Sequence, residues 1–230
     1  MRYHACITRS IIIIYFICTA SAGIAQFKAG SVNWTKDGTG LYEIQDNMLL
    51  RINPLSAQQV TVLATATQLT PREKDKPLTI ADFEISPDEN ILLIFTNTAR
   101  VWRYNTRGDY WILNRGTGQL KQIGKDKPSQ SLMYAKLSPD GKKVGYVSNH
   151  NIYTEDIDSG NTIALTTNGN RQLINGTFDW VYEEEFAFTR AYEWSPDGSK
   201  IAFLRFDESA VPGFTMEKFS NGVYPEPIKC

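Results

Sequence analysis

A short turn motif occurs four times along this chain of 230 residues, and its spacing constrains the fold more than any other feature. Three copies read Ser-Pro-Asp and one reads Thr-Lys-Asp; their aspartates are Asp37, Asp88, Asp140 and Asp197, spaced 51, 52 and 57 residues apart. An apolar run follows each copy. Because Pro presets φ and Asp can bond its own backbone, each copy predicts a tight turn between two β-strands.

Turns that recur at intervals of about 40–55 residues are typical of β-propeller blades with about four strands each. No stretch of 12 residues shows convincing helical periodicity, so the sequence predicts an all-β fold. We expect a partial β-propeller of about four blades within residues 26–230. The alternative is a β-sandwich, in which turns recur faster, every ~8–12 residues.

Two of the expected blades are longer than the repeat allows. The second carries about ten extra residues, best placed at 98–108, and the third about fifteen, within 166–192. Blades of fixed length stack on one another, so the extra residues must leave the sheet as excursions, and such loops often carry function. The first excursion holds Trp102 and Arg103, and the second holds the run 179–186, Asp-Trp-Val-Tyr-Glu-Glu-Glu-Phe.

Three consecutive carboxylates, Glu183, Glu184 and Glu185, follow aromatic residues in the second excursion. We expect a turn or two of helix here, and side chains about 100° apart let two of the three face one cavity. Paired carboxylates can bind a metal, act as acid and base, or clamp an ammonium group. No histidine or Asp-rich loop accompanies them, so we expect no metal and no cofactor. Arg103 either holds a carbonyl or carboxylate of a ligand or simply neutralises the glutamates.

Residues 1–25 are expected to be a signal peptide. Arg2 and Arg9 give the segment a basic N-terminal region. Residues 11–20 are apolar, and Ala20-Ser21-Ala22 offers the small residues that a signal peptidase needs. Ten apolar residues are too few to span a bilayer, which takes about 20. The sequence therefore predicts an exported protein, periplasmic or at the cell surface, with an uncleaved membrane anchor as the alternative.

The charge balance excludes one class of partner. With 24 basic and 25 acidic residues the net charge is −1, so we expect no nucleic-acid binding driven by a basic surface. Three cysteines, two of them within residues 1–25, exclude a disulfide scaffold.

The run Asp179–Glu185 closely resembles the double-glutamate motif of the dipeptidyl peptidase IV family of serine peptidases. Val101-Trp102-Arg103 resembles the arginine segment of that family, and residues 194–212 are similar to the family's segment immediately after the glutamates. The resemblance implies an eight-bladed N-terminal β-propeller and a C-terminal α/β-hydrolase domain, with substrate bound between them. It also implies a serine-type exopeptidase that releases X-Pro or X-Ala dipeptides.

By this resemblance, Glu184 and Glu185 bind the free α-amino group of a peptide, and Arg103 holds the carbonyl of its penultimate residue. Further residues would form a supporting shell, namely Asp179, Trp180, Tyr182, Glu183 and Trp102. The expected partners are peptides with a free N-terminus and a hydrolase domain, and a homodimer is left open.

The catalytic half of the family pattern is missing from the printed sequence. No Gly-x-Ser-x-Gly elbow occurs in it, so we expect residues 26–230 to be an incomplete propeller, with no catalytic residue of its own and the hydrolase domain absent. Whether the chain belongs to an active enzyme stays open. The alternatives are a non-enzymatic periplasmic propeller that binds protein partners, or a truncated product without function. A glycosidase is disfavoured, since adjacent glutamates seldom bracket a bond at the required ~5–9 Å.

Overall fold

The computed structural model describes residues 33–219 and 224–229, with one short helix among many strands. Its first sheet is antiparallel with four strands in sequential order, and together they make the first blade. These strands are β1 (Asn33–Trp34), β2 (Leu41–Gln45), β3 (Met48–Asn53) and β4 (Ser56–Ala64).

Two further blades lie side by side in an eight-stranded sheet. The second blade comprises β5 (Asp82–Ile85), β6 (Ile91–Ala99), β7 (Arg107–Asn114) and β8 (Gln119–Gln122). The third comprises β9 (Leu132–Leu137), β10 (Lys143–Ser148), β11 (Asn151–Asp156) and β12 (Thr162–Ala164). They are joined because β7 pairs with β9 as well as with β8.

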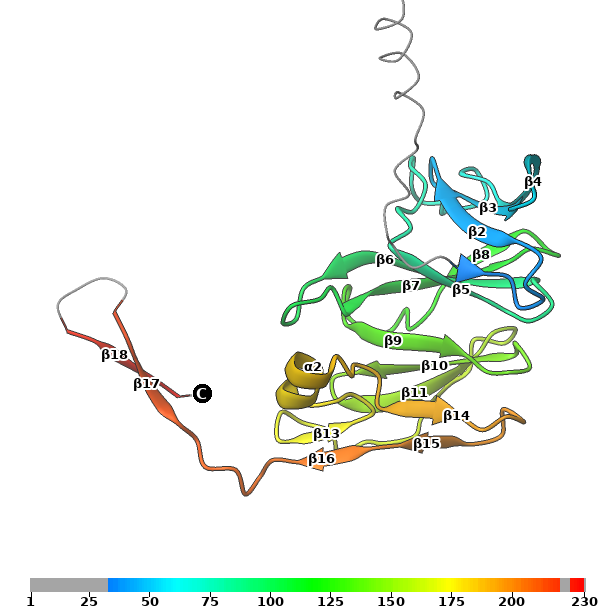
Figure 1. Cartoon of the computed structure of the whole chain (residues 1–230). Helices are drawn as coiled ribbons and strands as arrows, with labels where there is room; N and C mark the ends of the chain where they lie inside the picture. Colours follow the sequence, from blue (N-terminus) through cyan, green and yellow to red (C-terminus); the bar gives the residue numbers. More distant parts are fainter. Residues whose placement is uncertain (1–32, 220–223, 230) are drawn as a thin grey trace, which may run out of the picture.

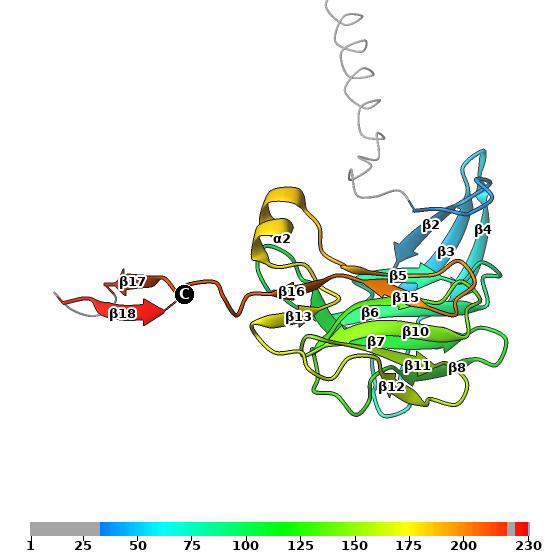
Figure 2. The same cartoon turned by 90° about the horizontal axis from the view of Figure 1, so that it is seen from below.

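The fourth blade is split into two pairs of strands, β13 with β16 and β14 with β15. Its elements are β13 (Leu173–Asn175), α2 (Trp180–Phe186), β14 (Tyr192–Trp194), β15 (Ile201–Phe203) and β16 (Arg205–Asp207). The blades stack as an open arc (Figure 1), which confirms the expected partial propeller. A last hairpin, β17 (Thr215–Lys218) and β18 (Glu226–Lys229), extends away from the arc in both views (Figures 1 and 2).

The four predicted turns share one hydrogen bond. A Ser or Thr hydroxyl donates to the aspartate two residues later, at 2.5–2.6 Å, in the pairs Thr35–Asp37, Ser86–Asp88, Ser138–Asp140 and Ser195–Asp197. This bond lowers the pKa of every one of these aspartates, and that of Asp197 falls to about 2. The residue after the aspartate has a positive φ in each turn; it is glycine in three turns and Glu89 in the other.

Strand β6 shows how the blades stack. Because successive side chains of a strand point to opposite faces, Ile91 and Leu93 pack into a cluster with the third blade. Leu92 and Ile94 pack on the other face, in a cluster with the first blade. All four side chains are buried, so the second blade is covered on both faces.

The predicted signal peptide, residues 1–25, lies outside the described residues. Within the part that is described, no helix is long and apolar enough to cross a membrane.

Candidate functional site

Both predicted excursions emerge at the same end of the arc. The first connects β6 to β7 through residues 100–106, and the second carries β13 and α2 between β12 and β14. Figure 1 shows α2 and the β6–β7 connection at one end of the sheets, with the β9–β10 and β14–β15 turns at the opposite end. The spacing of the turn motifs therefore predicted where these insertions lie.

Helix α2 begins and ends with local caps. The Asp179 carboxylate accepts a hydrogen bond of 2.9 Å from the backbone N–H of Tyr182, as an N-cap residue does. Ala187 ends the helix in a left-handed conformation, with φ 56°. Asp179, predicted to belong to the supporting shell, thus fixes where the helix starts.

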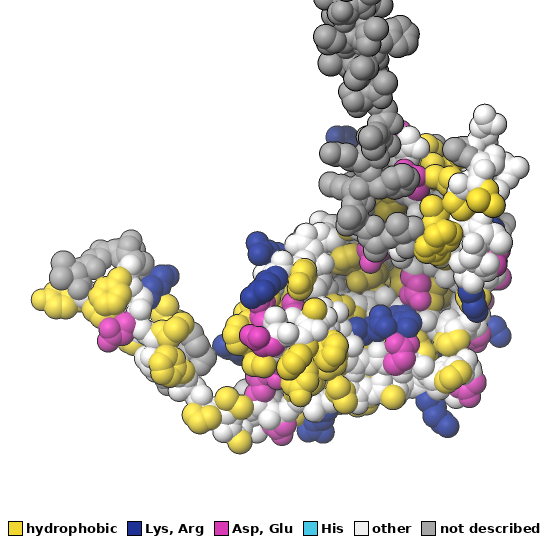
Figure 3. Space-filling model, viewed as in Figure 1, with side chains coloured by type: hydrophobic (Ala, Val, Ile, Leu, Met, Phe, Trp, Pro, Cys, Tyr) yellow, Lys and Arg dark blue, Asp and Glu magenta, His cyan; other side chains and the backbone are white. Residues whose placement is uncertain are grey.

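An aromatic cluster packs α2 against the fourth blade. The ring of Tyr182 lies 5.5 Å from the rings of Phe178 and Phe206, measured between centroids. Phe186 and Phe188 extend the cluster at one side and stay more than half exposed. Figure 3 shows hydrophobic side chains gathered over this end of the molecule.

The three glutamates of α2 have different environments. Glu183 is buried, with 4% of its surface exposed, and Glu184 has a side chain only 7% exposed. Glu185 is exposed. Two of the three thus face inward, as helix geometry predicts, and these two are Glu183 and Glu184.

An ion pair joins the two excursions. The Arg103 guanidinium contacts the Glu184 carboxylate through Nε and Oε2, and its own side chain remains 65% exposed. The structure therefore brings together two residues that lie 81 positions apart in the sequence. Glu185 has no ion pair within the described ranges 33–219 and 224–229, so its assignment to a ligand stays a prediction.

Glu183 carries a buried carboxylate oxygen that has no hydrogen-bond partner among residues 33–219 and 224–229. Burial raises the pKa of this carboxyl group, and the neighbouring Glu184 carboxylate raises it further. A buried acceptor without a partner costs about 1–3 kcal/mol, so its retention needs an explanation.

A cavity of 690 Å³ lies between the first excursion, α2 and the third blade. Trp102 and Trp180, both predicted as supporting residues, line it together with Glu183. Each tryptophan is about half exposed, at 51% and 52%. Among the described residues, Glu183 is the member of the glutamate run that contributes to the wall of this cavity.

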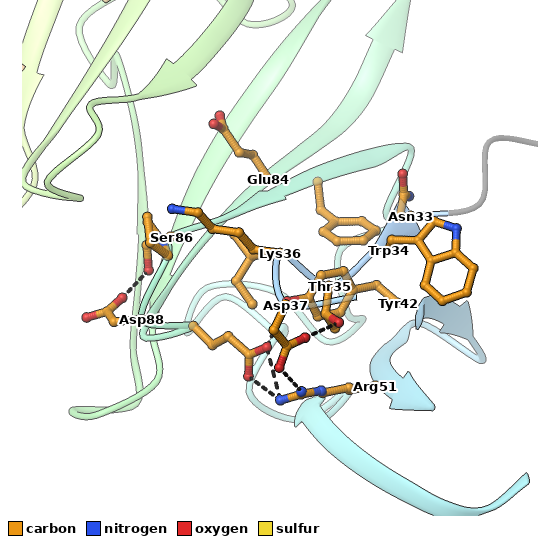
Figure 4. A pocket seen from close by; sticks show the side chains of 14 residues that line it. Asn33, Trp34, Thr35, Lys36, Asp37, Tyr42, Arg51, Glu84, Ser86 and Asp88 are labelled. Carbon is orange, nitrogen blue, oxygen red and sulfur yellow. Dashed lines mark hydrogen bonds and ion pairs between the residues drawn. The ribbon is translucent and has the colours of Figure 1, made fainter. Parts of the chain in front are cut away.

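A second cavity, of 840 Å³, lies between the first two blades (Figure 4). Arg51 pairs there with Asp37 at 3.2 Å and with Glu89 at 3.3 Å, and the Tyr42 hydroxyl donates to Glu89 at 2.7 Å. These contacts link the first blade to the second. Within residues 33–219 and 224–229, no group of three or more His, Cys, Asp or Glu side chains is arranged to hold a metal ion.

Gly169 anchors the base of the second excursion. Its N–H donates to the Asn151 side chain at 2.8 Å, and an added Cβ would lie 2.0 Å from the His150 carbonyl oxygen. Because that obstacle is backbone, we expect Gly169→Ala to lower the free energy of unfolding by about 1–3 kcal/mol in urea denaturation. Gly116→Ala is the control, since its Cβ would meet only side-chain atoms, of Asn90 at 3.2 Å and of Asn114 at 3.4 Å. Equal stability of both variants would contradict this prediction.

Comparison with known proteins gives one matching family. The sequence model described as "Dipeptidyl peptidase IV (DPP IV) N-terminal region" matches residues 86–230, a range that includes both excursions. A similar solved structure is the dipeptidyl peptidase 4 of Porphyromonas gingivalis, with 29% identity and a TM-score of 0.73, covering 87% of this chain and 28% of that one.

Two curated relatives show the same similarity. Prolyl endopeptidase FAP of mouse is 28% identical over 208 residues, which cover 90% of this chain and 26% of the relative. Dipeptidyl aminopeptidase B of Saccharomyces cerevisiae is 38% identical over 154 residues, which cover 65% of this chain and 18% of the relative. The chain thus spans about a quarter or less of the length of these proteins.

Proposed function

This chain belongs to the dipeptidyl peptidase IV family, and we propose that it is the substrate-recognition part of an exported dipeptidyl peptidase. In this proposal it binds the free N-terminus of a peptide, while a hydrolase domain of the serine type supplies the chemistry that releases X-Pro or X-Ala dipeptides. No Gly-x-Ser-x-Gly elbow occurs in residues 1–230, so the proposed role of this part is binding.

The observation that supports this proposal is the contact between Arg103 and Glu184. Each residue comes from a different excursion, so the pair is assembled only when the blades are folded. The carboxylate is largely covered while the guanidinium is mostly exposed. A guanidinium has five N–H donors, so Arg103 can hold Glu184 and still donate to a substrate carbonyl.

A peptide ammonium complements this arrangement. It offers three N–H donors, which Glu184 and, in our proposal, Glu185 accept as charge-assisted hydrogen bonds. Fixing the amine also fixes the peptide bond two residues along the chain relative to a nucleophile, which is the benefit of an oriented substrate. A blocked N-terminus supplies no ammonium donor to these carboxylates, so blocked peptides bind more weakly.

The test compares two peptides that differ only at their N-terminus. We expect the chain to bind a tripeptide with proline in second position about 10- to 100-fold more tightly than its N-acetylated form, measured by isothermal titration calorimetry. Equal affinity for the two peptides would overturn the amine-binding role. It would favour the alternative of a propeller that binds protein partners by other surfaces.

We also propose that the hairpin β17–β18 mediates a homodimer. Exposed apolar side chains run along the hairpin and its flanks, namely Phe214, Met216, Phe219, Tyr224 and Ile228. Figure 3 shows hydrophobic side chains on this hairpin, which extends away from the arc. A hairpin of two strands is only marginally stable by itself, so an apolar hairpin needs a surface to cover it. A second copy of the chain presents the same apolar hairpin, so two copies can cover each other.

A further inference from the structure

Strand β9 contains an irregularity directly beneath the candidate site. Its pairing with β10 shifts between Lys136 and Met133, so that one more residue lies on β9 than on β10. Tyr134 lies in this bulge with φ 54°, a conformation that a bulky residue rarely adopts. A β-bulge bends the strand and redirects a side chain, and bulges are frequent next to active sites.

The strained backbone is held from the fourth blade. The Tyr192 hydroxyl lies 2.5 Å from the carbonyl oxygen of Tyr134 and 2.7 Å from that of Gly145, on the facing strand β10. Tyr192 is 3% exposed, so water does not compete for these contacts. The bulge is therefore stabilised by specific contacts and is a fixed part of the fold.

The redirected Tyr134 side chain lines two cavities, each together with another buried polar group. Its hydroxyl, the hydroxyl of Thr106 and Oε1 of Glu183 are each buried without a hydrogen-bond partner among the described residues. Burial raises the pKa of Tyr134 to about 12, and the negative charge of the Glu183 carboxylate contributes to that rise. Tyr134 also lines the 690 Å³ cavity with Glu183 and a neighbouring cavity with Thr106.

These three groups complement one another chemically. Thr106 and Tyr134 each carry one O–H donor, and the Glu183 carboxylate has only acceptors. Without a hydrogen bond, each buried group destabilises the fold, because it has lost its contact with water. A chain of two hydrogen bonds would give all three groups a partner.

We propose that Tyr134 is a positioning residue for amine recognition, whose hydroxyl accepts from Thr106 and donates to Glu183. Thr106 is the last residue of the excursion that carries Arg103, and Glu183 lies one position before Glu184 on α2. The Tyr134 bridge thus holds the two excursions at the separation at which Arg103 and Glu184 meet. This inference rests on the proposed function, because it concerns the same peptide-binding site.

Tyr134→Phe removes only the bridging hydroxyl. We expect it to lower the preference for a free over an acetylated N-terminus by about threefold to tenfold, as the loss of one hydrogen bond would. Thr106→Val in the Tyr134→Phe background should add little, because both act on one bridge. Glu183→Gln keeps an acceptor for Tyr134 and should retain most of the preference, whereas Glu183→Leu should lose it.

Tyr146→Phe is the matched control, because the Tyr146 hydroxyl is also buried without a hydrogen-bond partner in the described part of the chain, on the strand beside the bulge. It should leave the preference unchanged. If the original chain prefers the free N-terminus and Tyr134→Phe retains that preference in full, the bridge is refuted while the proposed function stands. If the original chain shows no preference, the proposed function itself fails.

Discussion

Glu184→Gln is expected to weaken the binding of a peptide with a free N-terminus by about 10- to 100-fold. Glutamine keeps the shape of the side chain but removes the charge, and a hydrogen bond to a charged group contributes about 1.5–3 kcal/mol. The Glu184 side chain is only 7% exposed, so water replaces the lost interaction poorly. Calorimetric titration with the free and the acetylated peptide measures the effect, which should appear only for the free peptide.

Two variants make this result specific. Glu43→Gln makes the same chemical change at an exposed position of β2, in the first blade, and should bind like the original chain. Glu185→Gln should also weaken binding, since our proposal gives the ammonium a second carboxylate. If Glu184→Gln binds the free peptide as tightly as the original chain, the acidic clamp is refuted.

Met216→Asp is expected to convert a dimer into a monomer. Met216 lies on β17 opposite Ile228 of β18, and each of these side chains is more than a third exposed. If this apolar strip is the contact between two copies, a charge at its centre would be buried without a partner, at a cost of several kcal/mol. Analytical ultracentrifugation over a range of concentrations distinguishes the two states.

The control for the hairpin places the same residue on another exposed apolar position. Val60→Asp alters β4, at the far end of the arc, where 46% of the valine is exposed, and should leave the dimer intact. A chain that is monomeric at every concentration, or a Met216→Asp variant that stays dimeric, would refute the role of the hairpin.

The blades could be predicted because the information that forms each turn is local. A Ser or Thr hydroxyl bonds to an aspartate two residues later, so the motif itself contains donor, acceptor and turn. The positions of the excursions could be predicted from the same spacing, as residues that exceed the repeat. Helix α2 could be foreseen as well, since glutamate favours helices, and the structure adds that Asp179 caps its start.

The arrangement within the site could not be predicted in this way. Which glutamates turn inward depends on how Tyr182 packs against Phe206, a contact between distant parts of the chain. The bulge at Tyr134 has no signal in its own sequence, because it is held by Tyr192, 58 residues further on. The resemblance to a known family singled out Arg103, Glu184 and Glu185, whose role in binding is a proposal. Thr106 and Tyr134 became visible only in the folded chain.

The separation of the two ends of each blade has a consequence for evolution and engineering. The repeated Ser–Asp hydrogen bonds stabilise the turns at one end of the blades, here called the turn rim. Ligand contacts are proposed only for the opposite end, several residues away along the same strands. Substitutions can therefore change the ligand specificity of the site with little effect on the stability of the fold. Loops taken from a relative should be tolerated in place of the two excursions, provided that the graft starts and ends within the strands and leaves the turn rim unchanged.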